Sequence, residues 1–287
     1  MKNTKGDTVF EVKEDGKLLE TVRKELPKLP SGKAKSCLEH RMISVDGIIT
    51  SKFDYPVKCG QTVKITQSDV SSYSSPLPLI YEDEYLLAVN KPAGLLSVAN
   101  ELEKENTAIR LLRDSGIEPL YVVHRLDRDT SGVLLFAKNA EMHDKLKNSW
   151  DELIKRREYI AVCEGVFTEK KGRRESLLRE TENHLVYSAS YGEGKLAITN
   201  YEVIKENARY SYVRVLIDTG RKNQIRVHMK ELGHPIVGDK KYGGHTSSLG
   251  RLGLHASVLE LLHPQTGENL VIKAPIPTGF RLPKEKD

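Results

Sequence analysis

The sequence predicts an α+β protein in which a small α+β module precedes a large domain built on a mixed, mainly antiparallel sheet. The 287-residue chain is longer than one average domain, which favours a division into about two. The stretch QSDVSSYSSPLP, from Gln67 to Pro78, interrupts the apolar pattern and is typical of a linker. After it, most short segments have the spacing of strands. We therefore predict a module at 1–67, a linker at 68–78 and a larger domain at 79–287.

The first module is predicted to contain two short helices followed by short strands. Leu18, Val22 and Leu26 have helical spacing within Lys17–Leu26, and a second helix is expected over Lys33–His40. Strands joined in part by the turn dipeptide Asp46-Gly47 are expected at Met42–Val45, Ile48–Lys52 and Gln61–Thr66.

The larger domain is predicted to be rich in strands. Expected strands are Leu79–Tyr81, Tyr85–Asn90, Tyr121–Val123, Val133–Ala137, Glu158–Glu164, Ala197–Ile204 and Tyr210–Asp218. Expected helices are Thr107–Asp114, Asn139–Trp150 and Gln224–Leu232. In the last strand, Val213, Val215 and Ile217 occupy alternate positions, which predicts that one face of it packs in the core.

The composition excludes several classes of protein. With 38% hydrophobic and 30% charged residues, the chain is neither a membrane protein, a collagen-like fibre nor wholly disordered. No apolar run approaches the ~18 residues that a spanning helix needs, and no apolar signal segment follows Met1. The three cysteines are too scattered for a disulfide framework or a zinc cluster. We therefore expect a cytoplasmic protein.

The basic charge is concentrated at the start of the chain. Residues 1–67 carry 13 basic and 9 acidic side chains, so they hold +4 of the net charge of +5. Such a surplus favours a polyanionic partner, because neutralising phosphates releases counterions. A solvated face of a small domain explains the same charge equally well.

The segment VVHRLDRDTSG, residues 122–132, has an unusual density of residues able to do chemistry. A simple turn has no use for His124 and two arginines around two carboxylates. Asp129, Thr130 and Ser131 fit a structural role, closing a hairpin through side-chain bonds to the backbone. Asp127 is the functional candidate.

A second segment, DTGRKNQIRVH at residues 218–228, joins a strand to a helix. Arg221 lies at the junction, and Arg226 follows the apolar Ile225 by one position, at the edge of the packed face of the helix. A cation is disfavoured at a helix N-terminus, so this placement suggests an anionic partner for Arg226. Asp127 would be one such partner.

Taken together, these segments resemble the RluA-type pseudouridine synthases. The matching residues are His124-Arg125-Leu126-Asp127 with Thr130-Ser131-Gly132, Gly220-Arg221 with Gln224-Ile225-Arg226-Val227-His228, Lys155 through Tyr159 with Ala161, and Asn90-Lys91-Pro92-Ala93-Gly94. The four motifs occur in the family's order. Lys222 and Asn223 depart from it, standing where "TH" is common. The resemblance implies a sheet of the pseudouridine synthase type and an enzyme that isomerises uridine in RNA without cofactor or metal.

The resemblance also implies roles for residues. Asp127 would act as nucleophile or as base at the ribose, and Arg226, as its ion-pair partner, would lower its pKa. Tyr159 would stack on the base, with Ile225 beneath it. Arg125 would fill the gap left when the uridine is extruded from the RNA stack.

Five more residues of the larger domain are candidate RNA contacts. His124 either contacts RNA or caps the end of a strand. Lys91 and Arg221, with the Lys240-Lys241 pair, are candidate phosphate contacts, and each fits solvated surface as well.

The first module resembles the S4 RNA-binding domain over Ser31 to Ile65. Lys33, Lys35 and Arg41 are its candidate phosphate contacts, and an α+β module without an RNA role is the alternative. Gly32 and Gln61 depart from the family pattern, which has Arg and Asp there. The expected substrate is structured RNA, first large-subunit ribosomal RNA, with transfer RNA as the alternative.

Three other functions compete with this interpretation. Asp127 and Asp129 would lie about 7 Å apart on a strand, near the spacing of the acids in an inverting glycoside hydrolase, although aromatic residues are few. The chain would alternatively be a non-catalytic RNA-binding or ribosome-assembly factor. Metal-dependent hydrolysis is disfavoured because no two histidines have helical zinc spacing, and Cys163 fits a buried apolar position.

Overall fold

The computed structural model describes residues 8–27, 34–35, 37–38, 43–50, 52–65, 75–101, 103–189, 192–245 and 249–283. The chain divides into two compact units, Met1–Pro76 with Arg110–Pro119, and Leu77–Ile109 with Leu120–Asp287. The division after Pro76 falls inside the predicted linker. Among the described residues, no helix has the length and apolar character that crossing a membrane requires.

The N-terminal unit contains a small antiparallel sheet and a helix. Its described elements are β1 (Thr8–Glu11), β2 (Gly16–Lys17), α1 (Leu18–Glu25), β3 (Ile43–Val45), β4 (Ile48–Ile49), β5 (Pro56–Val57) and β6 (Thr62–Ile65). The strands pair in the order β1-β6-β3-β4, and β2 pairs with β5. Leu18 and Val22 of α1 join Val45 and Val63 of the sheet in one core, which explains the helical spacing of the apolar residues.

The predicted hairpin in this unit is present. Asp46 and Gly47 have φ values of 48° and 83°, the positive values that a tight two-residue turn between twisted strands requires. The Asp46 carboxylate accepts hydrogen bonds from the Thr62 amide at 2.8 Å and from Gln61 Nε2 at 2.9 Å. The turn is therefore fastened to β6, and Gln61 has a structural role.

Only part of the predicted basic set of this unit can be placed. Lys33 and Arg41 lie outside the described residues, as does half of the helix expected over Lys33–His40, whose described residues 34–35 and 37–38 are helical. Lys35 is exposed, with Nζ 5.4 Å from the centre of the Phe53 ring, within cation–π range. Its charge therefore faces solvent over an aromatic ring.

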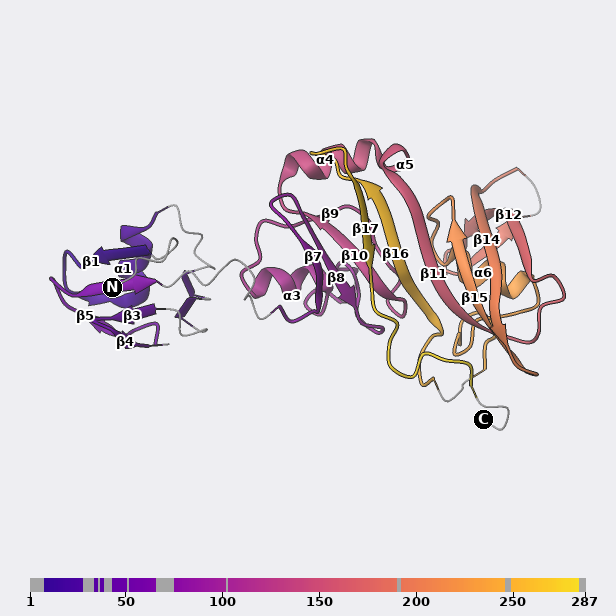
Figure 1. Ribbon diagram of the computed structural model, residues 1–287, viewed down its shortest axis with the longest axis horizontal. Helices are drawn as coiled ribbons and strands as arrows, with labels where there is room; N and C mark the ends of the chain where they lie inside the picture. The colour runs from indigo at the N-terminus through magenta and orange to yellow at the C-terminus, as the bar shows by residue number, and fades with distance from the viewer. Residues whose placement is uncertain are drawn as a thin grey trace. The chain divides into compact units, whose positions relative to one another are not determined.

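The larger unit is built on a sheet that has eleven strands in the described part of the chain (Figure 1). The strands are β7 (Leu79–Glu82), β8 (Leu86–Lys91), β9 (Tyr121–Val122), β10 (Ser131–Ala137), β11 (Ile154–Glu164), β12 (Lys171–Glu180), β13 (Val186–Ala189), β14 (Lys195–Glu206), β15 (Tyr210–Ile217), β16 (Leu254–Leu262) and β17 (Asn269–Lys273). The remaining described helices of the chain are α3 (Ala108–Asp114), α4 (Ala140–Asn148), α5 (Trp150–Leu153) and α6 (Gln224–Glu231).

The strand order confirms the predicted mixed, mainly antiparallel sheet. It runs β13-β12-β14-β15-β11-β16-β10-β8-β7, with β9 also on β10 and β17 also on β16. Of the strand pairs described, β10 and β16 are parallel and the others are antiparallel. The late strand β16 thus lies between β10 and β11, which are much earlier in the chain, and Figure 1 shows β16 beside β11.

One row of residues across the sheet explains a glycine in the first motif. Gly132 on β10 pairs with Ala256 on β16, Ala256 pairs with Tyr159 on β11, and Tyr159 pairs with Val215 on β15. Gly132 has φ of 116°, and a Cβ atom there would lie 2.1 Å from the Ala256 carbonyl oxygen. No other residue allows β10 and β16 to approach this closely. The row brings Tyr159 and the strand leading to α6 toward the segment before Gly132.

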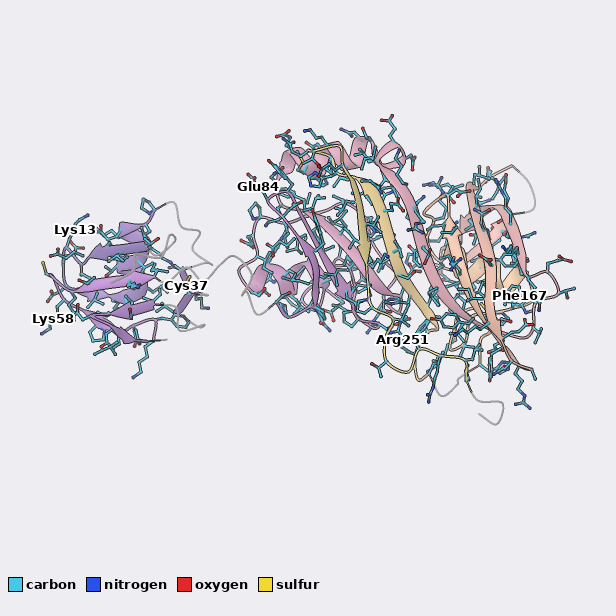
Figure 2. All side chains as sticks on the ribbon, viewed as in Figure 1. Lys13, Cys37, Lys58, Glu84, Phe167 and Arg251 are labelled. Atoms are coloured by element: carbon cyan, nitrogen blue, oxygen red, sulfur yellow. The ribbon has the colours of Figure 1, made fainter. Side chains whose placement is uncertain are left out.

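The core of the sheet uses the apolar positions that the strand pattern predicted. Val213 and Val215 are fully buried and pack with Ile225 and Met229 of α6, whose apolar face covers them. The start of β10 is fastened to β16 by polar contacts. Ser131 Oγ bonds to His255 Nδ1 at 2.7 Å and accepts a hydrogen bond from Arg251, which is labelled in Figure 2.

Several elements were not predicted. The largest are β12 and β16, and β12 (KGRRESLLRE) has charged residues at most outward positions with little buried surface, so its apolar pattern is weak. The helix expected over Asn139–Trp150 is instead two helices, α4 and α5, separated at Ser149. The Asn139 side chain caps α4, accepting a hydrogen bond from the Met142 amide at 2.8 Å.

Candidate active site

The segment that carries Asp127 connects β9 to β10, and its backbone is held in place by Ser97. Ser97 Oγ accepts a hydrogen bond from the Leu126 amide at 3.0 Å and donates one to the Leu126 carbonyl at 2.9 Å. On the other side, the Thr130 amide donates to the Asp127 carbonyl at 3.2 Å. The backbone is thus fixed on both sides of Asp127. Ser97 was not singled out from the sequence, because no spacing links it to a residue 29 positions later.

Lys91 is a buried clamp, so the prediction that it contacts phosphate is wrong. Its side chain is fully buried, and Nζ donates to the carbonyl oxygens of Pro92, Leu95 and Arg128 at 3.0, 2.7 and 3.0 Å. Burial lowers the pKa of Lys91 to about 7. A second pair of contacts lies beside the clamp, since Gly94 N donates to the Arg128 carbonyl and Arg128 Nε donates to the Gly94 carbonyl. Lys91 therefore braces the Asp127 segment from behind.

His124 has a structural contact, which favours the second of its two predicted roles. Its Nε2 accepts a hydrogen bond from the Leu135 amide at 2.9 Å, so the neutral ring must carry its proton on Nδ1. The ring lies 5.3 Å from that of Trp150, and burial lowers the pKa of His124 to about 4. The imidazole is thus an uncharged support between the Asp127 segment and β10.

The structure brings the three predicted catalytic residues into one pocket. A cavity of about 80 Å³ is lined by Asp127, Tyr159 and Arg226. The other motif residues that line it are Arg125, Leu126, Thr130, Gly220, Arg221, Asn223, Gln224 and Ile225. Tyr159 projects from β11, and Ile225 and Arg226 come from the first turn of α6, so three separate parts of the fold meet here.

Two opposing effects act on the pKa of Asp127. Burial raises the pKa of the Asp127 carboxyl above its ordinary value, although Arg226 lowers it, as predicted. The opposing cations are Arg226, Arg125, Lys91 and Lys222, in decreasing order of effect, and they do not outweigh burial. The pocket therefore holds a carboxylate whose ionised form is costly and depends on the surrounding cations.

The expected ion pair between Arg226 and Asp127 is replaced by another. Arg226 Nε and Nη2 donate to the two carboxylate oxygens of Asp239, each at 2.7 Å, and Asp239 is almost fully buried. The helix N-terminus does supply a cation with an anionic partner, as predicted, but the partner is Asp239, immediately before the Lys240-Lys241 pair. Arg226 thus acts on Asp127 through its charge and position rather than through a direct bond.

Asn223 and Tyr242 complete the support of Arg226. Asn223 precedes α6 with φ of 54°, and its Oδ1 accepts from Arg226 Nη1 at 3.0 Å. Its Nδ2 donates to the Tyr242 hydroxyl at 3.2 Å, and the Arg226 guanidinium lies 5.1 Å from the centre of the Tyr242 ring. Asn tolerates this left-handed conformation better than most residues. Asn223, which departs from the family motif, therefore has a structural function.

Two exposed arginines and a buried threonine also line the pocket. Arg125 and Arg221 are exposed, and Arg221 Nε donates to the Leu196 carbonyl at 2.9 Å. Thr130 is almost fully buried, and its Oγ1 has no partner among the described residues, so it does not close a hairpin through a side-chain bond. Asp129 is exposed and does not line the cavity, which argues against paired glycosidase acids.

Tyr159 and Cys163 differ in what they can do although both lie on β11. Burial, with Asp127 nearby, raises the pKa of Tyr159 to about 12, so its phenol stays neutral and its ring presents an uncharged face to the pocket. Cys163 is fully buried in the core and burial raises its pKa, which makes it a poor nucleophile, as expected.

Comparison with known proteins identifies the class of this site. Residues 85–231 match the family described as RNA pseudouridylate synthase, and this stretch includes Asp127, Tyr159 and Arg226. The chain belongs to this family and is an RNA pseudouridine synthase, an isomerase.

Three relatives place it more closely. The chain is 30% identical to ribosomal large subunit pseudouridine synthase D of Pasteurella multocida, over 92% of this chain and 89% of the relative. It is 36% identical to tRNA pseudouridine synthase C of Haemophilus ducreyi, over 69% of this chain and 90% of the relative. The structure of human RNA pseudouridylate synthase domain containing 1 matches with a TM-score of 0.58 and 25% identity, over 73% of this chain and 87% of that one. The expected RluA-type membership is thereby confirmed.

Proposed function

We propose that this protein converts specific uridines of large-subunit ribosomal RNA to pseudouridine in the cytoplasm, with Asp127 as the catalytic residue. The observation that carries the proposal is the position of Asp127 in a pocket walled by Tyr159 and Arg226. A single carboxylate, a fixed cation and an aromatic wall are the groups that this isomerisation needs.

The reaction breaks the bond between N1 of uracil and C1′ of ribose, turns the base and joins its C5 to C1′, with loss of the hydrogen on C5. Asp127 acts on the ribose as nucleophile or as base, and either role requires its ionised form. Arg226, Arg125, Lys91 and Lys222 favour that form electrostatically. The fixed charge of Arg226 costs no reorganisation during the reaction, because Asp239 and Asn223 already hold it.

The base and the RNA stack require two further residues. Tyr159 offers a neutral ring face on which the detached uracil stacks without using its hydrogen-bonding edge, and Ile225 packs beside it. Arg125 is exposed and lines the pocket, and its planar guanidinium fills the place of the extruded nucleotide.

Large-subunit ribosomal RNA is favoured over transfer RNA by the extent of the two matches. The ribosomal relative aligns with 92% of this chain, whereas the transfer RNA relative aligns with 69%. The N-terminal unit carries most of the net charge and exposes Lys35, which supports a contribution to RNA affinity. Transfer RNA is the alternative substrate.

The catalytic assignment is tested by release of tritium from RNA labelled at C5 of uridine, because joining C5 to C1′ expels that hydrogen. We expect Asp127→Asn to fold and bind RNA but to lose activity by at least about 10³-fold. Wild-type tritium release from this variant would refute the role of Asp127. The target is tested by mapping pseudouridine in ribosomal and transfer RNA from cells lacking the gene. A site lost only from transfer RNA would select the alternative.

A further inference from the structure

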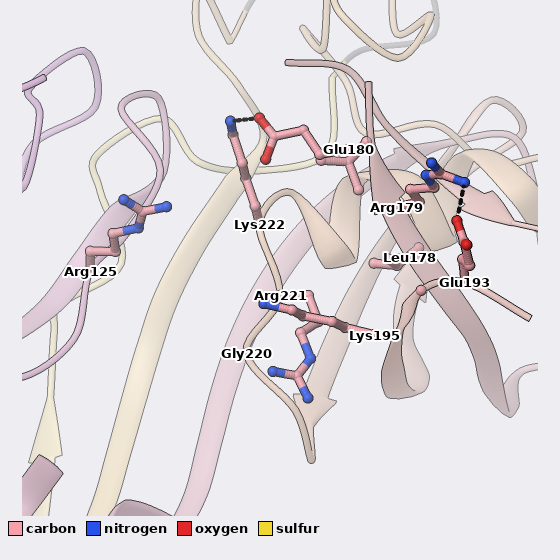
Figure 3. A pocket seen from close by; sticks show the side chains of 11 residues that line it. Arg125, Leu178, Arg179, Glu180, Glu193, Lys195, Gly220, Arg221 and Lys222 are labelled. Atoms are coloured by element: carbon pink, nitrogen blue, oxygen red, sulfur yellow. Dashed lines mark hydrogen bonds and ion pairs between the residues drawn. The ribbon is translucent and has the colours of Figure 1, made fainter. Parts of the chain in front are cut away.

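A second, larger cavity opens beside the catalytic pocket. It has a volume of about 570 Å³ and shares Arg125, Gly220 and Arg221 with that pocket (Figure 3). We call it the β12 groove and define it by its lining residues, Arg125, Leu178, Arg179, Glu180, Val186, Glu193, Gly194, Lys195, Gly220, Arg221 and Lys222. All of them belong to the larger unit.

The floor of the β12 groove is apolar and its walls are charged. Leu178 and Val186 are buried, at 5% and 4% exposure, and both line the groove. Leu178 pairs across the sheet with Lys195 on β14, so the neighbouring strand places a cation next to the floor. Arg179 is the next residue along β12. An apolar floor with cationic walls suits a polynucleotide strand, whose sugars pack on the floor while its phosphates meet the walls.

The charge of the lining is strongly positive. Its cations are Arg125, Arg179, Lys195, Arg221 and Lys222, and its anions are Glu180 and Glu193, which leaves an excess of three positive charges. Four different segments supply the cations, namely the Asp127 segment, strand β12, strand β14 and the loop before α6. The fold therefore concentrates cations here that are remote in sequence.

Glu193 does not neutralise Arg179 firmly, whereas the pair of Lys222 and Glu180 is less exposed, at 34% and 37%. Arg179 Nη1 lies 2.8 Å from Glu193 Oε2, and Lys222 is paired with Glu180, as Figure 3 shows. The Arg179 and Glu193 side chains are 53% and 77% exposed. Ion pairs this exposed contribute little and are screened by salt, so a phosphate can share or replace the carboxylate.

We propose that the β12 groove binds the phosphodiester backbone of the RNA strand that flanks the uridine held in the Asp127 pocket. The proposal rests on the proposed function, since it takes the same RNA as ligand. Arg125 and Arg221 line both cavities, so a strand in the groove leads directly to the catalytic pocket. The groove thereby positions the target nucleotide as well as adding affinity.

The test compares two arginines on β12. Arg179 lines the groove, whereas Arg173 does not, yet both side chains are 53% exposed and each pairs with a glutamate at 2.7 to 2.8 Å. Arg179→Ala, Lys195→Ala and the matched control Arg173→Ala are made in the full chain. Binding is measured against salt concentration in the Asp127→Asn background, with a large-subunit ribosomal RNA fragment as probe.

We expect Arg179→Ala and Lys195→Ala each to weaken binding several-fold and to reduce the slope of log affinity against log salt by about 0.7 to 0.9. Arg173→Ala should change neither. Glu193→Gln removes a competing anion and should tighten binding, a result that damage to the fold would not produce. In proteins with Asp127 intact, tritium release should show the groove variants raising KM more than they lower kcat.

Failure of this proposal is distinct from failure of the proposed function. If the wild-type protein releases tritium but Arg179→Ala and Lys195→Ala match Arg173→Ala in affinity and salt slope, the groove is not an RNA site. If the groove variants weaken RNA binding while the wild-type protein releases no tritium from any RNA, the groove stands and the isomerase assignment at Asp127 is overturned.

Discussion

The Asp127 pocket and the β12 groove lie side by side and use the same kinds of side chain in opposite ways. Arg226 in the wall of the pocket and Lys91 behind the Asp127 segment are buried and bonded, to the Asp239 carboxylate and to three carbonyl oxygens. In the groove, Arg179 and Lys195 are exposed. From this difference we infer that buried cations supply a fixed electrostatic field at Asp127, whereas exposed cations supply affinity for RNA that salt can screen.

The largest effect is expected at the buried guanidinium. Arg226→Ala should lower kcat/KM by about 10³-fold, and Arg226→Lys and Asp239→Asn by about 10²-fold, because each loses the bidentate geometry that fixes the charge. Without this cation the pKa of Asp127 rises further, so the acid limb of kcat/KM should move to higher pH. Tritium release measured over pH checks this.

The control for Arg226 is Arg174, which pairs with Glu231 at the other end of α6 and is 40% exposed. Arg174→Ala should leave the pH profile in place. The Arg226 defects should also persist at high salt, where the defects of groove variants disappear. Equal salt dependence of the two sets would remove the distinction between the pocket and the groove.

The next effect concerns stability. Lys91→Met leaves the carbonyls of Pro92, Leu95 and Arg128 without their donor, so we expect a loss of about 2 to 3 kcal/mol in the free energy of unfolding. Activity should also fall, because the Asp127 segment loses its brace. Denaturant unfolding measures the loss, and exposed Lys240→Met should stay within about 0.5 kcal/mol of wild type. A Lys91→Met protein as stable as that control would contradict the clamp.

A smaller effect is expected from pH. The folded-state pKa of His124, about 4, lies below its ordinary value of 6.5. Between these two pH values the unfolded chain therefore binds a proton at His124 that the native protein does not bind. His124 therefore contributes stability above pH 6.5 that is lost as the pH falls toward 4, by at most about 3 kcal/mol. His124→Gln should flatten this part of the stability profile, and exposed His184→Gln should not. Parallel profiles for all three proteins would show that His124 is not buried in a neutral form.

The smallest effect should come from the N-terminal unit. Lys35→Ala removes one exposed cation, so RNA affinity should fall a few-fold and the salt slope by about 0.7 to 0.9. Exposed Lys58→Ala in the same unit is the control. If Lys35→Ala and Lys58→Ala have the same effect, this unit attracts RNA through its general charge and not through an S4-like surface.

The sequence located the pocket but not its internal bonds. The resemblance to the pseudouridine synthases implied that Asp127, Tyr159 and Arg226 act together, and they line one cavity. It did not predict that Arg226 pairs with Asp239 or that Lys91 is buried, because the same motif letters are compatible with exposed or buried lysine and with either carboxylate.

For the fold too, strands with a regular apolar pattern were predicted, and strands without one were missed. Strands with alternating buried residues, such as β15, were predicted nearly to their ends. β12 was missed because only Leu178 in it is deeply buried, and its polar residues give no period. The β12 groove was missed with it, since the groove depends on which strands become neighbours.

The position of β16 has a consequence for the time at which the enzyme becomes active during its own synthesis. Ser131 contacts His255, 124 residues later, and β16 is the strand that joins β10 to β11. Until the ribosome has released the chain beyond Ala256, no strand connects β10, which follows the Asp127 segment, to β11, which carries Tyr159. Pairing across such a sequence separation is also slow. The nascent chain can thus expose its basic N-terminal unit to RNA well before it can modify a nucleotide.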